Sequence, residues 1–184
     1  MKNFIKAICV LIILLSIQIK PVFSARDTNS YDGNIFPIYA GNGSLVPPQS
    51  NLKESLDNKR TSVIVYYLDD SSSSKIFAPV VSGIKLLWSS SIDLIPLTTD
   101  EIQNKERNNP SNESYYWSGS VPQVVVINGN GEVVLDKTGQ VEIEDINSAI
   151  SKATGLEPPD FTISIKSFNE YNSEPSKDGY TDPR

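Results

Sequence analysis

The spacing of hydrophobic residues along the chain predicts alternating strands and helices. Residues 62–68 are β-branched and aromatic with little alternation, which indicates a strand buried on both faces of a parallel or mixed sheet. Apolar residues then recur every three or four positions through 72–89, which predicts an amphipathic helix kinked at Pro79. Residues 92–97 form the next predicted strand.

The second half of the pattern predicts a hairpin and a closing helix. Residues 98–119 are polar and are interpreted as a surface insertion with little regular structure. A proline-led strand follows at 121–127, and Asn128-Gly129-Asn130-Gly131 predicts a hairpin because Asn-Gly tolerates positive φ. Apolar residues from 143 to 153 share one helical face, which ends at Gly155.

Shorter signals flank this central pattern. Residues 35–40 predict a short strand, and Pro37 favours a place at the edge of the sheet. Asn51 precedes Glu54 by three residues, which predicts a capped helix start. Residues 161–165 alternate and predict a last edge strand, within an extension over 158–184 that is otherwise expected to be largely disordered.

The first residues have the pattern of a targeting segment. Lys2 and Lys6 precede an almost continuous apolar run over 7–17, and small residues at 22–25 offer a cleavage site after Ser24 or Ala25. This order is typical of a secretory signal peptide, and the run is shorter than the roughly 20 residues that span a bilayer. We therefore expect residues 1–25 to be a signal peptide, with an uncleaved membrane anchor as the alternative. Residues 26–34 are polar and are expected to be a flexible lead-in.

Composition excludes most routes to catalysis. The 184 residues include no His and one Cys, Cys9, which lies in the targeting segment. A chain without His has no Ser-His-Asp triad, and one Cys supports neither a disulfide nor a Cys-x-x-Cys pair. With 22 acidic and 16 basic residues the chain is also unsuited to nucleic acid. We expect a non-enzymatic protein without a cofactor or a metal.

The element order and two local motifs resemble a thioredoxin-like fold. Ser71-Ser72-Ser73-Ser74-Lys75 follows the buried strand where that fold carries Cys-x-x-Cys-Lys, and Ala78-Pro79 continues the match. Val121-Pro122-Gln123 resembles the family's Ile-Pro-Thr, whose proline is cis and faces the active site. The resemblance implies an α/β domain with a central mixed sheet flanked by helices, assigned to residues 35–157.

Ser71 and Ser74 stand where the resemblance places the two cysteines, so with Pro122 they mark a degenerate active site. Thiol–disulfide exchange needs a thiolate and a second thiol, and a serine hydroxyl supplies neither. The alternative that a serine acts as an activated nucleophile lacks a histidine base. We interpret these serines as caps of the following helix.

A wider resemblance covers nearly the whole chain after residue 25. Several segments are similar to the thylakoid membrane photosystem I accumulation factors of oxygenic phototrophs. They are Tyr31-Asp32-Gly33-Asn34, residues 39–48, residues 66–72 and Phe168-Asn169-Glu170. That resemblance implies export to the thylakoid lumen or the lumenal face of its membrane. It also implies binding of photosystem I subunits or assembly intermediates, with membrane association through the N-terminal segment.

Two groups of residues are candidates for partner binding. Tyr115, Tyr116 and Trp117 precede Pro122, and aromatic anchors dominate many interfaces, although the rings could instead cover the sheet as core. Asp69 and Asp70 follow a strand, where a solvated turn is favoured over a Ca²⁺ or Mg²⁺ site. Two functions remain open: a non-catalytic accessory factor for photosystem I accumulation, and an exported thioredoxin-like oxidoreductase with a degenerate site.

Overall fold

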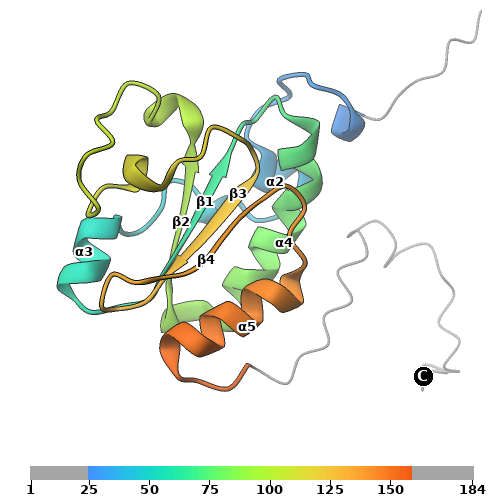
Figure 1. The fold of residues 1–184 in the computed structure, drawn as a ribbon. Coiled ribbons are helices and arrows are strands. Elements are labelled where there is room, and N and C mark those ends of the chain that lie inside the picture. The colour runs from blue at the N-terminus through green and yellow to red at the C-terminus, as the bar shows by residue number, and fades with distance from the viewer. Residues whose placement is uncertain (1–24, 159–184) are drawn as a thin grey trace, which may run out of the picture.

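One mixed sheet organises the computed structural model, which describes residues 25–158 (Figure 1). Its strands are β1 (Ser62–Tyr67), β2 (Asp93–Thr98), β3 (Gln123–Ile127) and β4 (Val133–Thr138), in the order β2-β1-β3-β4. β1 pairs parallel with β2 and antiparallel with β3, and β3 pairs antiparallel with β4. This is the thioredoxin-like α/β arrangement predicted from the sequence.

The central strand confirms the prediction of two-sided burial. Val63, Val65 and Tyr67 face one hydrophobic cluster, while Ile64 and Tyr66 face the other. All six residues of β1 are buried, because helices or loops cover both faces of the sheet. A continuous apolar run is what this environment selects.

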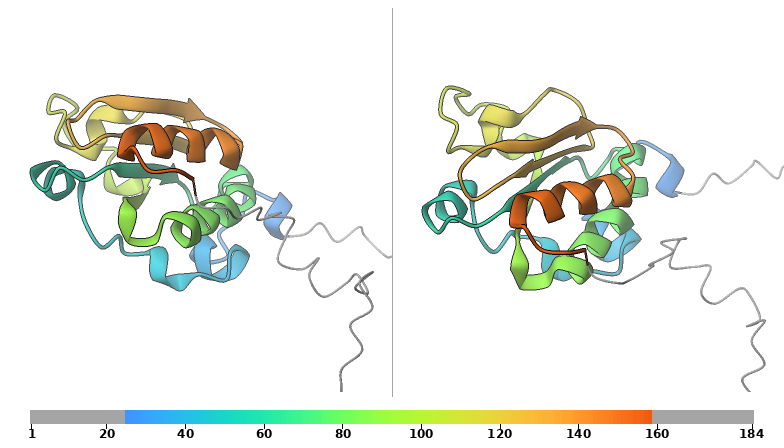
Figure 2. Two further views of the ribbon diagram at one scale, coloured as in Figure 1. Left: turned by 90° about the horizontal axis from the view of Figure 1, so that it is seen from below. Right: turned by 60° about the horizontal axis from the view of Figure 1, so that its bottom comes forward.

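Three helices cover the first face of the sheet: α2 (Ile35–Tyr39), α4 (Ser72–Trp88) and α5 (Ile143–Thr154). α4 lies between the other two, which the view from below shows (Figure 2). The predicted helices at 72–89 and from 143 are confirmed. Gly155 ends α5 with φ of 73°, a conformation that glycine adopts without strain.

The strand predicted at 35–40 is wrong, because these residues form α2. Asn34 caps the helix by accepting the Phe36 N–H at 3.0 Å, and Asp69 accepts the Ile35 N–H at 2.9 Å. Pro37 lies in the first turn, where a backbone N–H has no intrahelical acceptor, so the proline costs no hydrogen bond. The Asx cap therefore outweighs the β propensity of the isoleucines.

A short helix and a long irregular segment cover the second face. α3 (Leu52–Asp57) begins after Asn51, whose side chain accepts the Glu54 N–H at 2.9 Å as predicted. Residues 98–119 contain only two short 3-10 turns, η4 (Thr99–Glu101) and η5 (Glu113–Tyr116). The segment is irregular as predicted, yet two of its own residues, Ile102 and Ser114, are buried.

The free edge of β2 is protected by its own sequence. The Asp93 N–H donates to the Thr61 carbonyl at 2.9 Å, so the alternate residues Leu94, Pro96 and Thr98 turn their backbone outward. Pro96 has no N–H to offer a further strand, which suits an edge position.

Several expectations concern residues outside the described range. They remain predictions, and they concern the targeting segment with residues 22–24 of the cleavage site, the strand at 161–165 and the disordered extension beyond residue 158. Within residues 25–158, no helix is long and apolar enough to cross a membrane.

Candidate functional site

The start of α4 carries Ser71 and Ser74, where the resemblance places two cysteines. Ser71 is the N-cap, and its Oγ accepts the Ser74 N–H at 3.3 Å. Ser74 is buried, and its own Oγ accepts the Leu68 N–H at 3.2 Å. Both hydroxyls therefore hold the turn between β1 and α4 together. Ser71 matches the interpretation as a helix cap, whereas Ser74 binds a backbone N–H that precedes the helix.

Pro122 lies at the same end of the sheet, because β3 begins where the antiparallel β1 ends. The Val121–Pro122 peptide bond is cis, as the resemblance implied. The Pro122 carbonyl accepts the Gly139 N–H at 2.8 Å, and the Gln140 side chain donates to the Ser73 carbonyl at 2.8 Å. The fold thus brings the three predicted active-site positions to one edge, while their atoms take part in structural hydrogen bonds.

Lys75 is the feature of this site that sequence reasoning missed. Its side chain is fully buried, and its Nζ donates to the carbonyls of Ala25, Thr28 and Ser30 at 2.9, 3.1 and 2.6 Å. It also pairs with Asp32 Oδ2 at 2.5 Å and lies 5.5 Å from the centre of the Tyr39 ring. Carbonyls, carboxylate and ring together replace the water lost by the ammonium group.

The residues that surround Lys75 form a strap, residues 25–32, across the start of α4 (Figure 1). The Asn29 side chain accepts the free Ser72 N–H at 2.9 Å, and Arg26 donates to the Ile76 carbonyl at 3.5 Å. Residues 26–34, expected to be a flexible lead-in, thus include a strap that is hydrogen-bonded to α4 in this structure. The one sequence signal for such hydrogen bonds is the high proportion of Asp, Asn, Ser and Thr over residues 27–32.

The electrostatics of the strap favour a charged pair. Burial opposes the charge of Lys75, but the hydrogen bond to Asp32 and the nearby Tyr39 outweigh it and raise the lysine pKa. Hydrogen bonds from Lys75 and Tyr39 lower the pKa of Asp32. A lysine held as a cation is unsuited to act as a base for Ser71 or Ser74.

The aromatic segment, residues 115–117, contains both packed and exposed rings. Trp117 lies 5.3 Å from the Tyr66 ring, and Tyr116 donates to the Pro110 carbonyl at 2.9 Å. Both rings pack on the cluster of the second face. Tyr115 is 47% exposed and stacks edge-to-face on Tyr116 at 5.0 Å. Of the three predicted residues, Tyr115 alone is exposed, and it offers about half of its surface to a partner.

Gln123 holds the aromatic segment in place and was not singled out by the sequence. The side chain is fully buried beside Pro122. Its Nε2 donates to the Tyr116 carbonyl at 2.9 Å and to Asp136 at 2.7 Å, and its Oε1 accepts the Ser118 N–H at 2.9 Å. This one side chain thus satisfies polar groups from the aromatic segment and from β4.

The two predicted aspartates have different environments. Asp69 accepts the Ile35 N–H, and its pKa is raised by burial, partly offset by that hydrogen bond. Asp70 is exposed. Among residues 25–158, no group of three or more His, Cys, Asp or Glu side chains could hold a metal ion.

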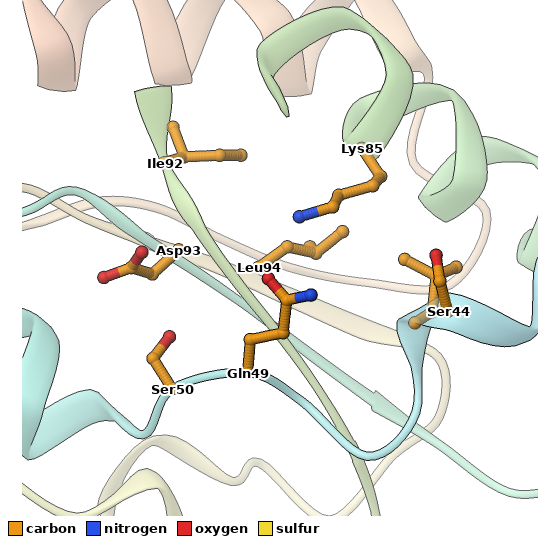
Figure 3. A pocket seen from close by; sticks show the side chains of 8 residues that line it. Ser44, Gln49, Ser50, Lys85, Ile92, Asp93 and Leu94 are labelled. Atoms are coloured by element: carbon orange, nitrogen blue, oxygen red, sulfur yellow. The ribbon is translucent and has the colours of Figure 1, made fainter. Parts of the chain in front are cut away.

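A shallow polar hollow lies at the opposite end of the sheet, beside the first residues of β2 (Figure 3). It is lined by Ser44, Leu45, Gln49, Ser50, Lys85, Ile92, Asp93 and Leu94. Asp93 is already paired with Arg60 at 2.9 Å. The hollow is therefore separate from the α4 start and has no concentration of unpaired charge.

Comparison with known proteins places this geometry in context. The chain is 38% identical over 153 residues to the thylakoid membrane protein slr1796 of Synechocystis sp., covering 82% of this chain and 76% of that protein. The chain belongs to the family of this thylakoid membrane protein. No protein-family model matches the chain. A thioredoxin mutant from Halobacterium salinarum NRC-1 superposes with a TM-score of 0.44 at 20% identity, over 58% of this chain and 86% of that one.

Proposed function

We propose that this protein is a non-catalytic accessory factor that promotes photosystem I accumulation by binding protein at the thylakoid membrane. The observation that carries the non-catalytic part is the state of Ser71 and Ser74. Both occupy the cysteine positions of a thioredoxin-like site, and both hydroxyls are engaged by backbone N–H groups. The similarity to the thylakoid membrane protein slr1796 supports the thylakoid location. The role in photosystem I accumulation is supported by the sequence resemblance.

The binding surface of this proposal lies where β1 ends and β3 begins. Tyr115 rests on a ring, Tyr116, that is itself anchored by a hydrogen bond, so it can be buried against a partner with little further loss of side-chain freedom. Asp70 is exposed at the end of β1 and supplies a charged rim to the same end of the domain. The packed Tyr116 and Trp117 position Tyr115 and are not themselves the contact.

A strain that carries Tyr115→Ala tests this surface. We expect less photosystem I in its thylakoids and reduced recovery of photosystem I subunits with the tagged protein. Val133→Ala is the matched control, since Val133 is equally exposed at 47% but lies on β4. Normal photosystem I levels in a strain lacking the whole protein would refute the assembly role.

Insulin reduction tests the non-catalytic part separately. We expect no thiol-dependent turnover from the purified protein, and a Ser71→Cys, Ser74→Cys double variant provides the positive control on the same scaffold. Turnover by the natural sequence would favour the alternative, an exported oxidoreductase with a degenerate site.

A further inference from the structure

Exposed hydrophobic residues gather on one side of the domain. Tyr31, Ile38, Ile76 and Leu86 are 74%, 50%, 40% and 71% exposed. Ser30 and Asp32 both turn toward Lys75, so Tyr31 between them turns outward, above the start of α4. We call these four residues the α2–α4 face.

The helices place the four residues on a common surface. α2 packs along α4, with Tyr39 against Lys75 and the Asn42 side chain donating to Ser82 Oγ at 3.1 Å. α2 buries Ile35 and Phe36 toward the sheet, which leaves Ile38 on the outer side. Ile76 and Leu86 are separated by nearly three turns of α4, which is about 15 Å along the helix and about 80° around it.

The charge of this face differs from that of the rest of the chain. The sequence has 22 acidic residues, yet residues 33–53 and 71–92, which include α2 and α4, contain none. Arg26 lies beside Ile76 at one end of the face. The strap adds the exposed Asp27 and Asp32, and Asp32 is paired with Lys75. The neighbouring α5 carries Glu144 and Asp145 in its first turn, so the carboxylate-free surface stops at α4.

Exposed aliphatic and aromatic side chains, on and beside two helices that carry no carboxylate, suit a surface that lies in a lipid–water interface. The chain also enters the domain at this face, since Arg26 contacts Ile76 and the apolar run over 7–17 ends only eight residues before Ala25. A bilayer reached by that run would meet the α2–α4 face first.

We propose that the α2–α4 face docks on the surface of a lipid bilayer. The docking orients the domain so that the β1–β3 end, with Tyr115, remains accessible at the membrane. This inference shares the membrane location with the proposed function and does not depend on photosystem I as the partner.

Site-specific fluorescence on the full chain tests the docking. In a Cys9→Ser background, single variants Ile38→Cys, Leu86→Cys and Val133→Cys are labelled with an environment-sensitive dye and mixed with phosphatidylcholine–phosphatidylglycerol vesicles. We expect a blue shift at positions 38 and 86 and none at 133. The measurement reports on the face whether or not residues 1–24 are retained.

A charge variant supplies the second measurement. Ile76→Glu with Leu86→Glu is expected to lower vesicle partitioning of a chain lacking residues 1–24 by about tenfold or more, since it removes two apolar groups and adds repulsion. Val133→Glu with Leu156→Glu, at positions elsewhere that are 47% and 49% exposed, is the control and should change little. Circular dichroism of this shortened chain checks that it is folded.

Three results would overturn the docking. One is a vesicle-bound chain whose labels at 38 and 86 do not shift, which would assign binding to the N-terminal segment alone. Another is equal loss of partitioning in the face and control variants. The third is a shift that requires added thylakoid protein. Photosystem I levels in the Tyr115→Ala strain are measured independently, so each proposal can fail without the other.

Discussion

Gln123→Leu isolates the contribution of a single buried side chain to the aromatic segment. Leucine has nearly the same volume, so the substitution removes three hydrogen bonds without leaving a large cavity. Two of these bonds join neutral groups and contribute about 1 kcal/mol each, and the bond to the Asp136 carboxylate contributes about 2 kcal/mol. The leucine gains about 1 kcal/mol from apolar burial. The expected loss in free energy of unfolding is therefore about 3 kcal/mol.

Urea denaturation and thermal melting measure this loss. For a domain of this size, about 3 kcal/mol corresponds to a decrease in Tm of about 10 °C. Trp117 packs on Tyr66 only while the segment is held, so its fluorescence should shift to the red in the folded variant. Gln140→Leu is the control, because it removes one exposed hydrogen bond to the Ser73 carbonyl and should cost less than about 1 kcal/mol.

Gln123→Glu provides an independent check by charge. The introduced carboxyl keeps the acceptor for the Ser118 N–H but faces the Asp136 carboxylate in place of a donor. Repulsion raises the pKa of the introduced group, so the variant should regain stability as the pH falls and the group is protonated. A Gln123→Leu variant as stable as Gln140→Leu, together with no pH response of Gln123→Glu, would refute the role of Gln123.

The remaining predictions concern the strap and the hairpin turn. Lys75→Met should release the strap, with faster hydrogen exchange over residues 25–32 and little change in the sheet. The raised pKa of Lys75 means that its stabilisation is complete below the ordinary lysine pKa and is lost as the pH rises through the folded value. The lowered pKa of Asp32 means that its stabilisation is complete above the ordinary aspartate pKa and is lost as the pH falls through the pKa of the folded state. Thermal melts of Asp32→Asn should therefore lack this loss of stability at acid pH. Gly129→Ala should cost more than 2 kcal/mol in urea denaturation, because the new Cβ would lie 2.3 Å from the Lys59 carbonyl oxygen, whereas Gly43→Ala meets no atom closer than 3.8 Å and should be nearly neutral.

Local sequence patterns were sufficient to predict the strands of the sheet and two of the helices that cover it. β1, α4 and α5 follow directly from hydrophobic spacing, because each buries a regular set of side chains in the common core. The Asn51 cap and the hairpin turn over residues 128–131 depend on neighbouring residues alone and were also predictable, with the positive φ at Gly131. α2 was not, because its start uses Asp69, which lies 34 residues away in the chain.

By itself the sequence determined the order of strands and helices along the chain, the serines at positions 71 and 74 and the absence of histidine. Each of these is a property of residue type and local spacing. Only the tertiary structure decided the burial of Lys75, the hydrogen bonds of Gln123 and which aromatic ring is exposed. These depend on groups brought together from distant parts of the chain, such as the Ala25 carbonyl 50 residues before Lys75. A buried polar side chain finds its partners only when the fold assembles them, so its role cannot be read from the residues beside it.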